Sequence, residues 1–565
     1  MSPVFTNQIV NNIVGKNLVF TEMAQQQIVE NPPKNTALGR LEAWIVKDSG
    51  WLALGIVVAA FAMRLAYASC CYLNPDEGTH FALARPSSWL GAYEASRHDT
   101  SPGLDIMVLH GMMFIGRTEL ILRLPSLLAG TAALWVTFAW LRRILGEIPA
   151  LAGLAFMTLS HGAISASTEV REYGLVLFFV CVSLYATEYA FADRSTFWAI
   201  IQGLFLIGAL LTHYTAIVVI ISVGLFTLVR LLSGDVPRRM LFTISASYAV
   251  LGILLVWLYF GQVRGHIPYG SRVMQYLENY YYTASETPLG FVWRSLSHTF
   301  TYAVGARRGA LLIMLVFTAG LGALLTGRTK APRLTALLVI APFAVGFAAA
   351  IARVFPFAGS RHQTYLLPFL AAGIAAALAW LRRGVALPML LLVAVIAPFW
   401  LITRTPDNDC RMQSTRDMDS AVEYVGRTVP LGAALFVDQE TYELLTYYLG
   451  RNDPNIQTLQ VDPNIQTQQV RPDTEEPIGG YRLVIPKLVW AFRPNEVLEQ
   501  VSQSAKELGV PPSEPLWIVS VSWAEPSLAS RLPAGQNREV REFGRISVIK
   551  IPALRSSAAG GFFCF

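Results

Sequence analysis

Long apolar runs separated by short polar segments fill the chain from residue 50 to residue 402. Such runs predict helices that cross a bilayer, because about twenty apolar residues span its hydrocarbon core. About eleven spans are expected by this criterion, at 50–70, 120–141, 149–167, 173–192, 197–212, 214–232, 241–261, 309–327, 333–352, 365–381 and 384–402. The run 103–116 is shorter and contains Asp105 and His110, so we expect an interfacial or re-entrant helix there instead of a span.

The pattern changes after residue 403. From 404 to 565, amphipathic stretches alternate with short β-rich runs, which predicts a small α/β domain. We expect helices at 415–427, 439–449 and 494–508, and strands at Ala434–Val437, Leu516–Val521 and Ile546–Ile549. The segment 453–458 is repeated at 462–467, and we interpret this duplication as a loop insertion. We expect this domain to recognise an acceptor or to shield the site.

Composition supports a polytopic membrane protein. The chain has 565 residues, of which 53% are hydrophobic and 15% charged, and its mean hydropathy is +0.44. These values exclude an ordinary soluble globular protein. The formal net charge of +6 comes mostly from arginines clustered between apolar runs, which suits membrane orientation better than nucleic-acid binding, so no nucleic-acid partner is expected.

Basic clusters indicate how the chain crosses the membrane. They follow alternate spans, at Arg142–Arg143, Arg194, Arg238–Arg239, Arg328 with Lys330 and Arg333, and Arg382–Arg383. Because basic loops face the cytoplasm, the polar segment 1–48 is expected to be a cytoplasmic tail. The transmembrane domain is then 49–403, with outer loops at 71–119 and 262–308, and the domain 404–565 lies on the outer, periplasmic side.

Polar residues from separate outer segments collect on one side in this topology. They are Asp76–Glu77, His98–Asp99, Glu169 with Arg171 and Tyr173, His213–Tyr214, and Arg361–His362. Ionisable residues at a membrane boundary cost stability unless they are solvated or paired. The set contains the acids, bases and phosphate-binding groups that an active site needs, so its convergence predicts one.

Asp76 and Glu77 are adjacent, so their side chains diverge on a helix or a strand and both are not expected to face one reacting atom. We predict that Asp76 is the general base and that Glu77 orients it or caps a helix dipole, with the reverse assignment left open. Arg171 offers a bidentate fork for phosphate and, with Tyr173, predicts a clamp for an anionic head group.

The remaining candidates each have a structural alternative. Asp99 follows His98 in a turn, where capping of the next helix is the alternative to a site role. His213 is either an interhelical hydrogen-bonding residue or a ligand. Arg361 and His362 either extend to the membrane interface or bind phosphate.

The order of these motifs resembles that of membrane glycosyltransferases of the GT-C fold. More narrowly, it is similar to bacterial family 39 enzymes, relatives of protein mannosyltransferases and of the lipid A aminoarabinose transferase. The motifs are Asp76–Glu77, His98–Asp99 with Pro102 and Leu104, Arg123–Ser126 with Gly130, Glu169 with Arg171 and Tyr173, Thr212–Tyr214, and Ser360–His362 with Leu366–Pro368. The chain departs from the family at Pro102–Gly103, where two prolines are common, and at 360–362, where arginine and tyrosine are commoner.

The resemblance implies a polyprenyl-phosphate-linked sugar as donor and an active site on the outer face of the cytoplasmic membrane. It also implies that Asp76 activates the acceptor. Some relatives bind a divalent metal, for which Asp99, Glu169 and His213 are the candidate ligands here. No other cofactor is expected.

We therefore expect a multi-pass glycosyltransferase of the inner membrane that moves a sugar to an acceptor hydroxyl. Its partners would be the lipid-linked donor, membrane lipids and a glycan, lipid or protein acceptor that the sequence does not identify. A single inverting displacement is expected, because a retaining route would need Glu169 as the nucleophile. The alternative is a transporter or flippase for an anionic lipid or lipid-linked sugar, which should show mid-bilayer charges and repeated halves.

Overall fold

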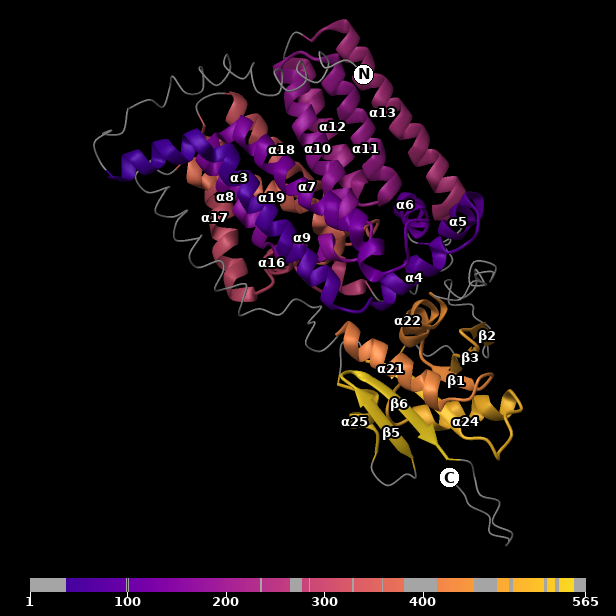
Figure 1. Cartoon of the computed structure of the whole chain (residues 1–565). Helices are drawn as coiled ribbons and strands as arrows, with labels where there is room; N and C mark the ends of the chain where they lie inside the picture. Colours follow the sequence, from indigo (N-terminus) through magenta and orange to yellow (C-terminus); the bar gives the residue numbers. More distant parts are fainter. Residues whose placement is uncertain are drawn as a thin grey trace, which may run out of the picture.

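The computed structural model describes residues 37–380, 414–451, 475–486, 491–522, 526–533 and 538–552, apart from short gaps at 98, 100, 234–235, 265–276, 284, 328–329 and 358. These residues form a helical bundle and a smaller α/β domain (Figure 1). The α/β domain lies beyond the end of the bundle that carries α4 (Pro75–Ala84), and its helix α22 (Gln439–Gly450) packs against α4.

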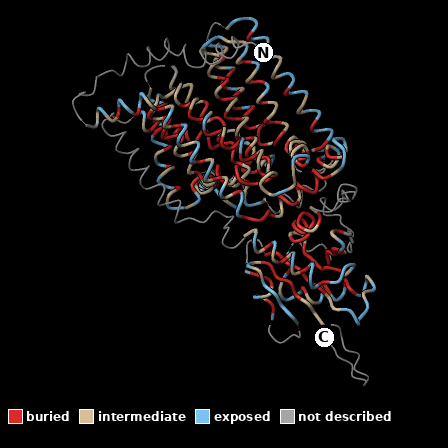
Figure 2. Tube along the Cα trace, viewed as in Figure 1, coloured by how far each residue is buried: buried red, intermediate tan, exposed pale blue. Residues whose placement is uncertain are grey.

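Eight of the described helices are long and apolar enough to cross a membrane. They are α3 (Ala37–Cys70), α7 (Glu119–Leu145), α10 (Tyr173–Ala192), α12 (Ala216–Ser233), α13 (Arg238–Leu258) with the following π-helical turn η1 (Tyr259–Val263), α17 (Arg307–Thr326), α18 (Lys330–Ile351), and α19 (Leu367–Trp380) with the 3-10 turn η4 (Arg361–Leu366) before it. Buried residues fill the bundle interior (Figure 2), and large apolar side chains such as Trp51 and Phe242 are exposed on its outside. The expectation of a multi-pass membrane protein is confirmed.

Two expected spans are not single long helices. The run 149–167 forms α8 (Glu147–Leu159) and α9 (His161–Thr168), which meet at a bend of 58°. The run 197–212 forms α11 (Thr196–Thr212), a shorter apolar helix. The last expected span, 384–402, lies outside the described residues.

Shorter helices connect the spans. They are α4, α5 (Trp89–Ser96), α6 (Leu104–Met113), the 3-10 turn η3 (Glu278–Tyr280) and α16 (Pro288–Val304). As expected, the run 103–116 forms a short helix, α6, rather than a span. Helix α6 packs against α4, α5 and α7.

Arg64 compensates for the break between α8 and α9. Arg64 belongs to α3 and is fully buried. Its guanidinium group donates to the carbonyl oxygens of Met157 and Thr158, both at 3.3 Å. Carbonyl groups at a helix end lack intrahelical partners, and the bilayer core supplies no water to replace them. The buried guanidinium therefore stabilises the bend through which the chain reaches the segment 169–172.

The α/β domain is built on a six-stranded sheet with the order β2-β3-β1-β4-β6-β5. The strands are β1 (Ala434–Val437), β2 (Glu475–Ile478), β3 (Tyr481–Val484), β4 (Leu516–Val521), β5 (Glu539–Phe543) and β6 (Ile546–Ile551). β3, β1 and β4 are parallel, whereas β2, β6 and β5 join by antiparallel pairing. The duplicated segment 453–467 lies outside the described residues.

Both faces of this sheet are covered. Leu435 and Val437 belong to one buried apolar cluster and Phe436 to another, as the alternation of side chains along a strand requires. The helices are α21 (Thr415–Thr428), α22, α24 (Val497–Glu507) and α25 (Leu528–Arg531). The predicted α/β character and the predicted strands β1, β4 and β6 are confirmed.

The close crossing of α17 and α19 depends on a glycine. A Cβ atom added to Gly320 would overlap the backbone carbonyl group of Gly373. Small residues allow membrane helices to approach at this distance. On the same helix, Gly322 has nothing within 4 Å of an added Cβ atom.

Gly320→Ala should therefore destabilise the protein by about 1–3 kcal/mol, the usual cost of overpacking. Gly322→Ala should be neutral or stabilising, because alanine favours a helix over glycine. Thermal unfolding of both variants in detergent, followed by tryptophan fluorescence, measures the difference. Equal unfolding temperatures would contradict the close crossing.

Candidate active site

Segments distant in sequence meet at the end of the bundle beside the α/β domain. They bring together the predicted residues Asp76, Asp99, Arg171, Tyr173, His213, Arg361 and His362. The local sequence explains the first of these positions. Asn74 caps α4 and Pro75 occupies its first turn, so Asp76 lies at the N-terminus of the helix.

Asp76 is the acid between two arginines. Its Oδ2 atom lies 3.5 Å from Nη1 of Arg171 and is also paired with Nη2 of Arg361, and its side chain is 34% exposed. Burial acts to raise the pKa of Asp76, but the guanidinium groups of Arg171 and Arg361 outweigh it and hold the pKa below its usual value. Asp76 is therefore an accessible carboxylate that is ionised at neutral pH.

Glu77 points elsewhere, as adjacent helical residues must. It is completely buried, and its carboxylate accepts hydrogen bonds from Nε and Nη2 of Arg123 at 2.8 and 2.7 Å. It also accepts from the backbone N–H groups of Asn74 and Val170, both at 2.7 Å. Glu77 has the capping geometry expected for it, and it ties the start of α4 to α7 and to the segment before α10.

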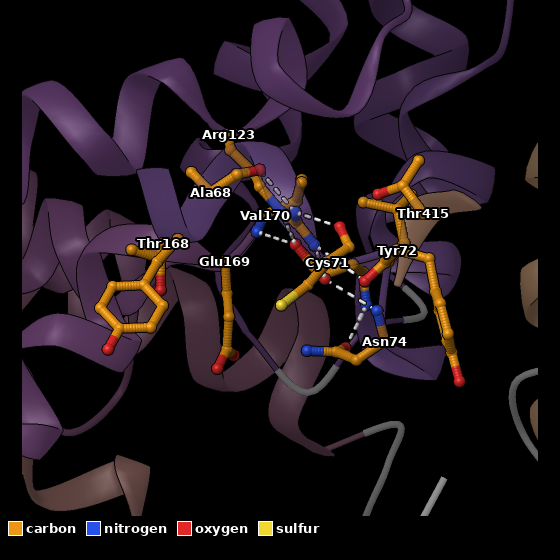
Figure 3. Close-up of polar contacts among 12 residues, drawn as sticks. Ala68, Cys71, Tyr72, Asn74, Arg123, Thr168, Glu169, Val170 and Thr415 are labelled. Carbon is orange, nitrogen blue, oxygen red and sulfur yellow. Dashed lines mark hydrogen bonds and ion pairs between the residues drawn. The ribbon is translucent and has the colours of Figure 1, made fainter. Parts of the chain in front are cut away.

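Arg123 completes this connection. Its guanidinium group also donates to the carbonyl oxygens of Ala68 and Cys71 at 2.8 Å and of Tyr72 at 3.2 Å (Figure 3). Ala68 is in the last turn of α3, where carbonyl groups lack intrahelical partners, and Cys71 and Tyr72 directly follow the helix. Arg123 was predicted only as part of a motif and without a role. The signal for a role was an arginine in the first apolar turn of a predicted span.

A second polar cluster lies behind Asp76. His80 is one turn further along α4, and its Nδ1 atom lies 3.0 Å from Oδ2 of Asp105. Its Nε2 atom lies 3.7 Å from Glu172 and 3.9 Å from Asp99. His213 approaches Glu172 from the other side, at 3.5 Å.

Charge in this cluster is dominated by acids. Burial and Arg171 act to lower the pKa of His80, but Asp105 and Glu172 raise it above its usual value. Burial also raises the pKa of Asp99. The pKa of Glu172 is lowered despite burial, because Arg171, His80 and His213 surround it. The cluster thus concentrates negative charge that is only partly compensated.

Three members of the cluster fit a divalent metal ion. One ligand atom each from His80, Asp105 and Glu172 lies within 4.8 Å of the others, and all three residues are buried. Among the described residues, the buried Oδ1 atom of Asp105 has no hydrogen-bond partner, whereas its Oδ2 atom faces His80 at 3.0 Å and the Oε2 atom of Glu172 lies 3.2 Å from Nε of Arg171. A mixed imidazole and carboxylate set suits zinc and similar transition metals.

The structure groups a different set from the predicted metal ligands. Asp99 and His213 border the triad, whereas Glu169 is not among the described residues that form it. The side chain of Glu169 accepts a hydrogen bond from Ser165 at 2.7 Å, and burial raises its pKa. None of His80, Asp105 and Glu172 was among the predicted ligands, although Asp76 and His80 have the i, i+4 spacing that places two residues on one helix face.

The opposite wall is cationic and aromatic. The Oη atom of Tyr173 lies 3.3 Å from Nδ1 of His362 and accepts from Nη2 of Arg171 at 3.5 Å. The guanidinium groups of Arg171 and Arg361 lie 5.5 and 6.0 Å from the centre of the Tyr173 ring. Two forked cations beside the partly exposed carboxylate of Asp76 have a geometry that suits a phosphate group.

Comparison with known proteins gives one family and several structures. The family model for dolichyl-phosphate-mannose-protein mannosyltransferases matches residues 99–260, which confirms the resemblance over that part of the chain. A search of curated protein sequences finds no match to the chain.

Among solved structures, ArnT from Cupriavidus metallidurans bound to undecaprenyl phosphate is similar at 16% identity, with a TM-score of 0.46 over 91% of this chain and 100% of that one. The Archaeoglobus fulgidus oligosaccharyltransferase in a complex with Zn and sulfate is 10% identical, with a TM-score of 0.42 over 82% of this chain and 67% of that one. AglB from the same organism, with an inhibitory peptide and a dolichol-phosphate, is 10% identical, with a TM-score of 0.43 over 84% of this chain and 70% of that one.

Removing the carboxylate of Glu77 should destabilise the protein strongly. Glu77→Gln would leave the buried guanidinium of Arg123 without its counter-ion, which typically costs about 3–5 kcal/mol. Glu423→Gln, which removes the exposed partner of Arg427, is the matched control and should change little. Unfolding by SDS in mixed micelles compares the two, and similar midpoints would show that the buried pair does not stabilise the fold.

The triad should bind a divalent metal. We expect Asp105→Asn or His80→Ala to weaken zinc or manganese binding at least about tenfold, the effect seen even for residues that only support a metal ligand. Glu169→Gln should keep the metal, because Glu169 lies outside the triad. Elemental analysis of purified protein after equilibration with each metal tests this, and unchanged metal content in the triad variants would exclude the site.

Proposed function

We propose that the protein transfers a sugar from a polyprenyl-phosphate donor to an acceptor hydroxyl group. The observation that carries this proposal is the accessible carboxylate of Asp76, held between the guanidinium groups of Arg171 and Arg361 at the end of a membrane bundle. A base next to a phosphate-binding fork is what such a transfer requires. The family match over 99–260 supports the same class of donor.

Arg171 and Arg361 would hold the donor phosphate. Arginine binds phosphate through two parallel hydrogen bonds, and the ring of Tyr173, which packs against His362, lies beside both guanidinium groups. The donor's polyprenyl tail is apolar and would remain in the bilayer beside the bundle. As the sugar leaves, negative charge grows on the phosphate and the two arginines stabilise it.

The same arginines regulate Asp76. Without donor they pair with its carboxylate and keep its pKa low, which makes it a weak base. A bound phosphate competes for both guanidinium groups, so the carboxylate loses its counter-ions as the donor binds. Asp76 would then accept the proton from the acceptor hydroxyl as that oxygen attacks the anomeric carbon.

One displacement of this kind inverts the anomeric centre. A retaining route needs a second carboxylate as nucleophile. Glu169, the sequence-based candidate, is buried beside Ser165, and burial raises its pKa, so it is poorly suited to that role.

A divalent ion held by His80, Asp105 and Glu172 would add positive charge near the phosphate and act as a Lewis acid. Arg171 links this triad to the proposed phosphate site. Arg171 lies between the two parts of the site, in contact with Glu172 at 3.2 Å and with Asp76 at 3.5 Å. Arg171 therefore couples phosphate binding to the charge of the triad.

We place the protein in the inner membrane, with the site and the α/β domain facing the periplasm. The basic clusters after alternate spans support this orientation. Transport of an anionic lipid or lipid-linked sugar is the competing function. The candidate residues gather at one end of the bundle rather than at its middle, which favours transfer over transport.

Asp76→Asn should abolish transfer. Loss of a general base costs about a hundredfold to ten-thousandfold in rate. Asp193→Asn, which removes the partner of Arg143 elsewhere in the bundle, should leave the rate unchanged. The assay uses protein in lipid nanodiscs, a panel of polyprenyl-phosphate sugars, an envelope acceptor fraction and mass spectrometry of the polyprenyl phosphate released.

Release of polyprenyl phosphate by wild type and the Asp193 variant, with none from the Asp76 variant, would support the proposal. If wild type leaves every donor intact but moves labelled donor between leaflets, the function is transport. Equal turnover by Asp76→Asn and wild type would exclude Asp76 as the base.

The pH dependence of kcat/KM, which reports the free enzyme, should reflect the lowered pKa of Asp76. An ordinary aspartate titrates at about 3.9. Because the pKa of Asp76 lies below its usual value, the base form persists as the pH falls, and the midpoint of the acidic loss of activity should lie below that of an ordinary aspartate. Arg361→Gln removes one of the two cations and should shift this loss to higher pH. A wild-type midpoint above about pH 5 would contradict the assignment.

A further inference from the structure

The α/β domain shares a hydrophobic core with the helix that carries Asp76. A single buried cluster contains Leu73 and Phe81 from the α3–α4 region and Leu444, Tyr447 and Tyr448 from α22. Protein interiors are close-packed, so one side of a shared core cannot shift without disturbing the other. The α/β domain is thus packed as part of the site's support.

Two contacts with α22 lie on either side of Asp76. Before it, the backbone N–H group of Leu73 donates to the Oη atom of Tyr448 at 3.0 Å, and this bond is buried. After it, Gly78 touches α22 so closely that an added Cβ atom would lie 2.5 Å from the carbonyl oxygen of Glu443. These contacts fix the backbone three residues before and two residues after Asp76.

The C-terminal half of α22 is tied to the start of α7. Tyr447 donates to the carbonyl oxygen of Arg117 at 2.8 Å and packs edge-on against Phe81. Arg451 pairs with Glu119, the first residue of α7, at 3.2 Å. Arg123 of α7 in turn binds Glu77 of α4. The region of α22 therefore contacts α7 as well as α4, the two helices that the pair of Glu77 and Arg123 joins.

We propose that the α/β domain is a positioning element of the site, with Tyr448 and the contact at Gly78 setting the angle at which Asp76 faces Arg171 and Arg361. The catalytic part of this inference rests on the proposed function. Tyr448 does not reach the reacting atoms and acts through the backbone of Leu73. Misplacing a catalytic group by about 1 Å costs on the order of a hundredfold in rate. Loosening the turn between α3 and α4, which leads into Asp76, would therefore lower kcat.

Two variants, each with a matched control, test this role. Tyr448→Phe keeps the ring but removes the acceptor for the Leu73 N–H group. Tyr481→Phe removes a hydroxyl that bonds only within the α/β domain, to the carbonyl oxygen of Val425 at 3.4 Å. Gly78→Ala pushes α4 away from α22, whereas Gly426→Ala on α21 adds a methyl group with nothing within 4 Å.

Each variant is measured in nanodiscs by hydrogen exchange of the peptide 72–84 and by steady-state transfer of the donor sugar. For Tyr448→Phe and Gly78→Ala we expect faster exchange in 72–84 and a fall in kcat of about ten- to a hundredfold, with donor KM changed less than about twofold. The controls should match wild type in both measurements. A merely structural role would reduce the yield of folded protein and leave kcat per folded molecule unchanged.

Unchanged exchange in 72–84 in both test variants would overturn the inference, whatever their activity. Faster exchange with an unchanged kcat would also overturn it, because the turn would then have moved without consequence for the reaction. If wild type transfers no sugar from any donor, the proposed function fails. The exchange data would in that case still show whether α22 controls the turn.

Discussion

The buried pair between Glu77 and Arg123 is the interaction on which the site depends. It joins the end of α3, the N-terminus of α4, the first turns of α7 and the backbone at Val170, all through one carboxylate and one guanidinium group. Such a pair is retained only with full hydrogen bonding, because two charges have been removed from water. Its geometry turns Glu77 inward and leaves Asp76, the preceding residue, partly exposed beside Arg171 and Arg361.

Charge balance is the second constraint. Asp105 and Glu172 are buried acids, Asp76 is a partly exposed one, and Arg171 contacts both Asp76 and Glu172. Clustered acids are stable when they share cations such as Arg171. Binding of a further anion or cation would therefore change the charge balance among these acids. A phosphate that engages the arginines and a metal that engages the triad would each compensate the charge that the other disturbs.

Local sequence patterns were sufficient to predict much of the fold and part of the candidate site. The apolar runs predicted the spans, Asn74–Pro75 marked the start of α4, and the convergence of Asp76, Arg171 and Arg361 followed from their loops lying on one side. The sequence offered Asp99, Glu169 and His213 as metal ligands, whereas the structure groups His80, Asp105 and Glu172, because the sequence-based choice did not use the direction of side chains within α4 and α6. The bend at Ser160 was missed, since the apolar run continues across it.

The contact between Tyr448 and Leu73 could not be predicted from local pattern, because it joins residues far apart in sequence through packing alone. We propose that donor phosphate displaces Asp76 from Arg171 and Arg361. A cryo-EM structure of the wild-type protein in nanodiscs with bound polyprenyl phosphate would show this displacement. We expect a phosphate in contact with Arg171 and Arg361 and an Asp76 carboxylate separated from both. A phosphate bound elsewhere, or Asp76 still paired with the arginines beside it, would contradict the claim.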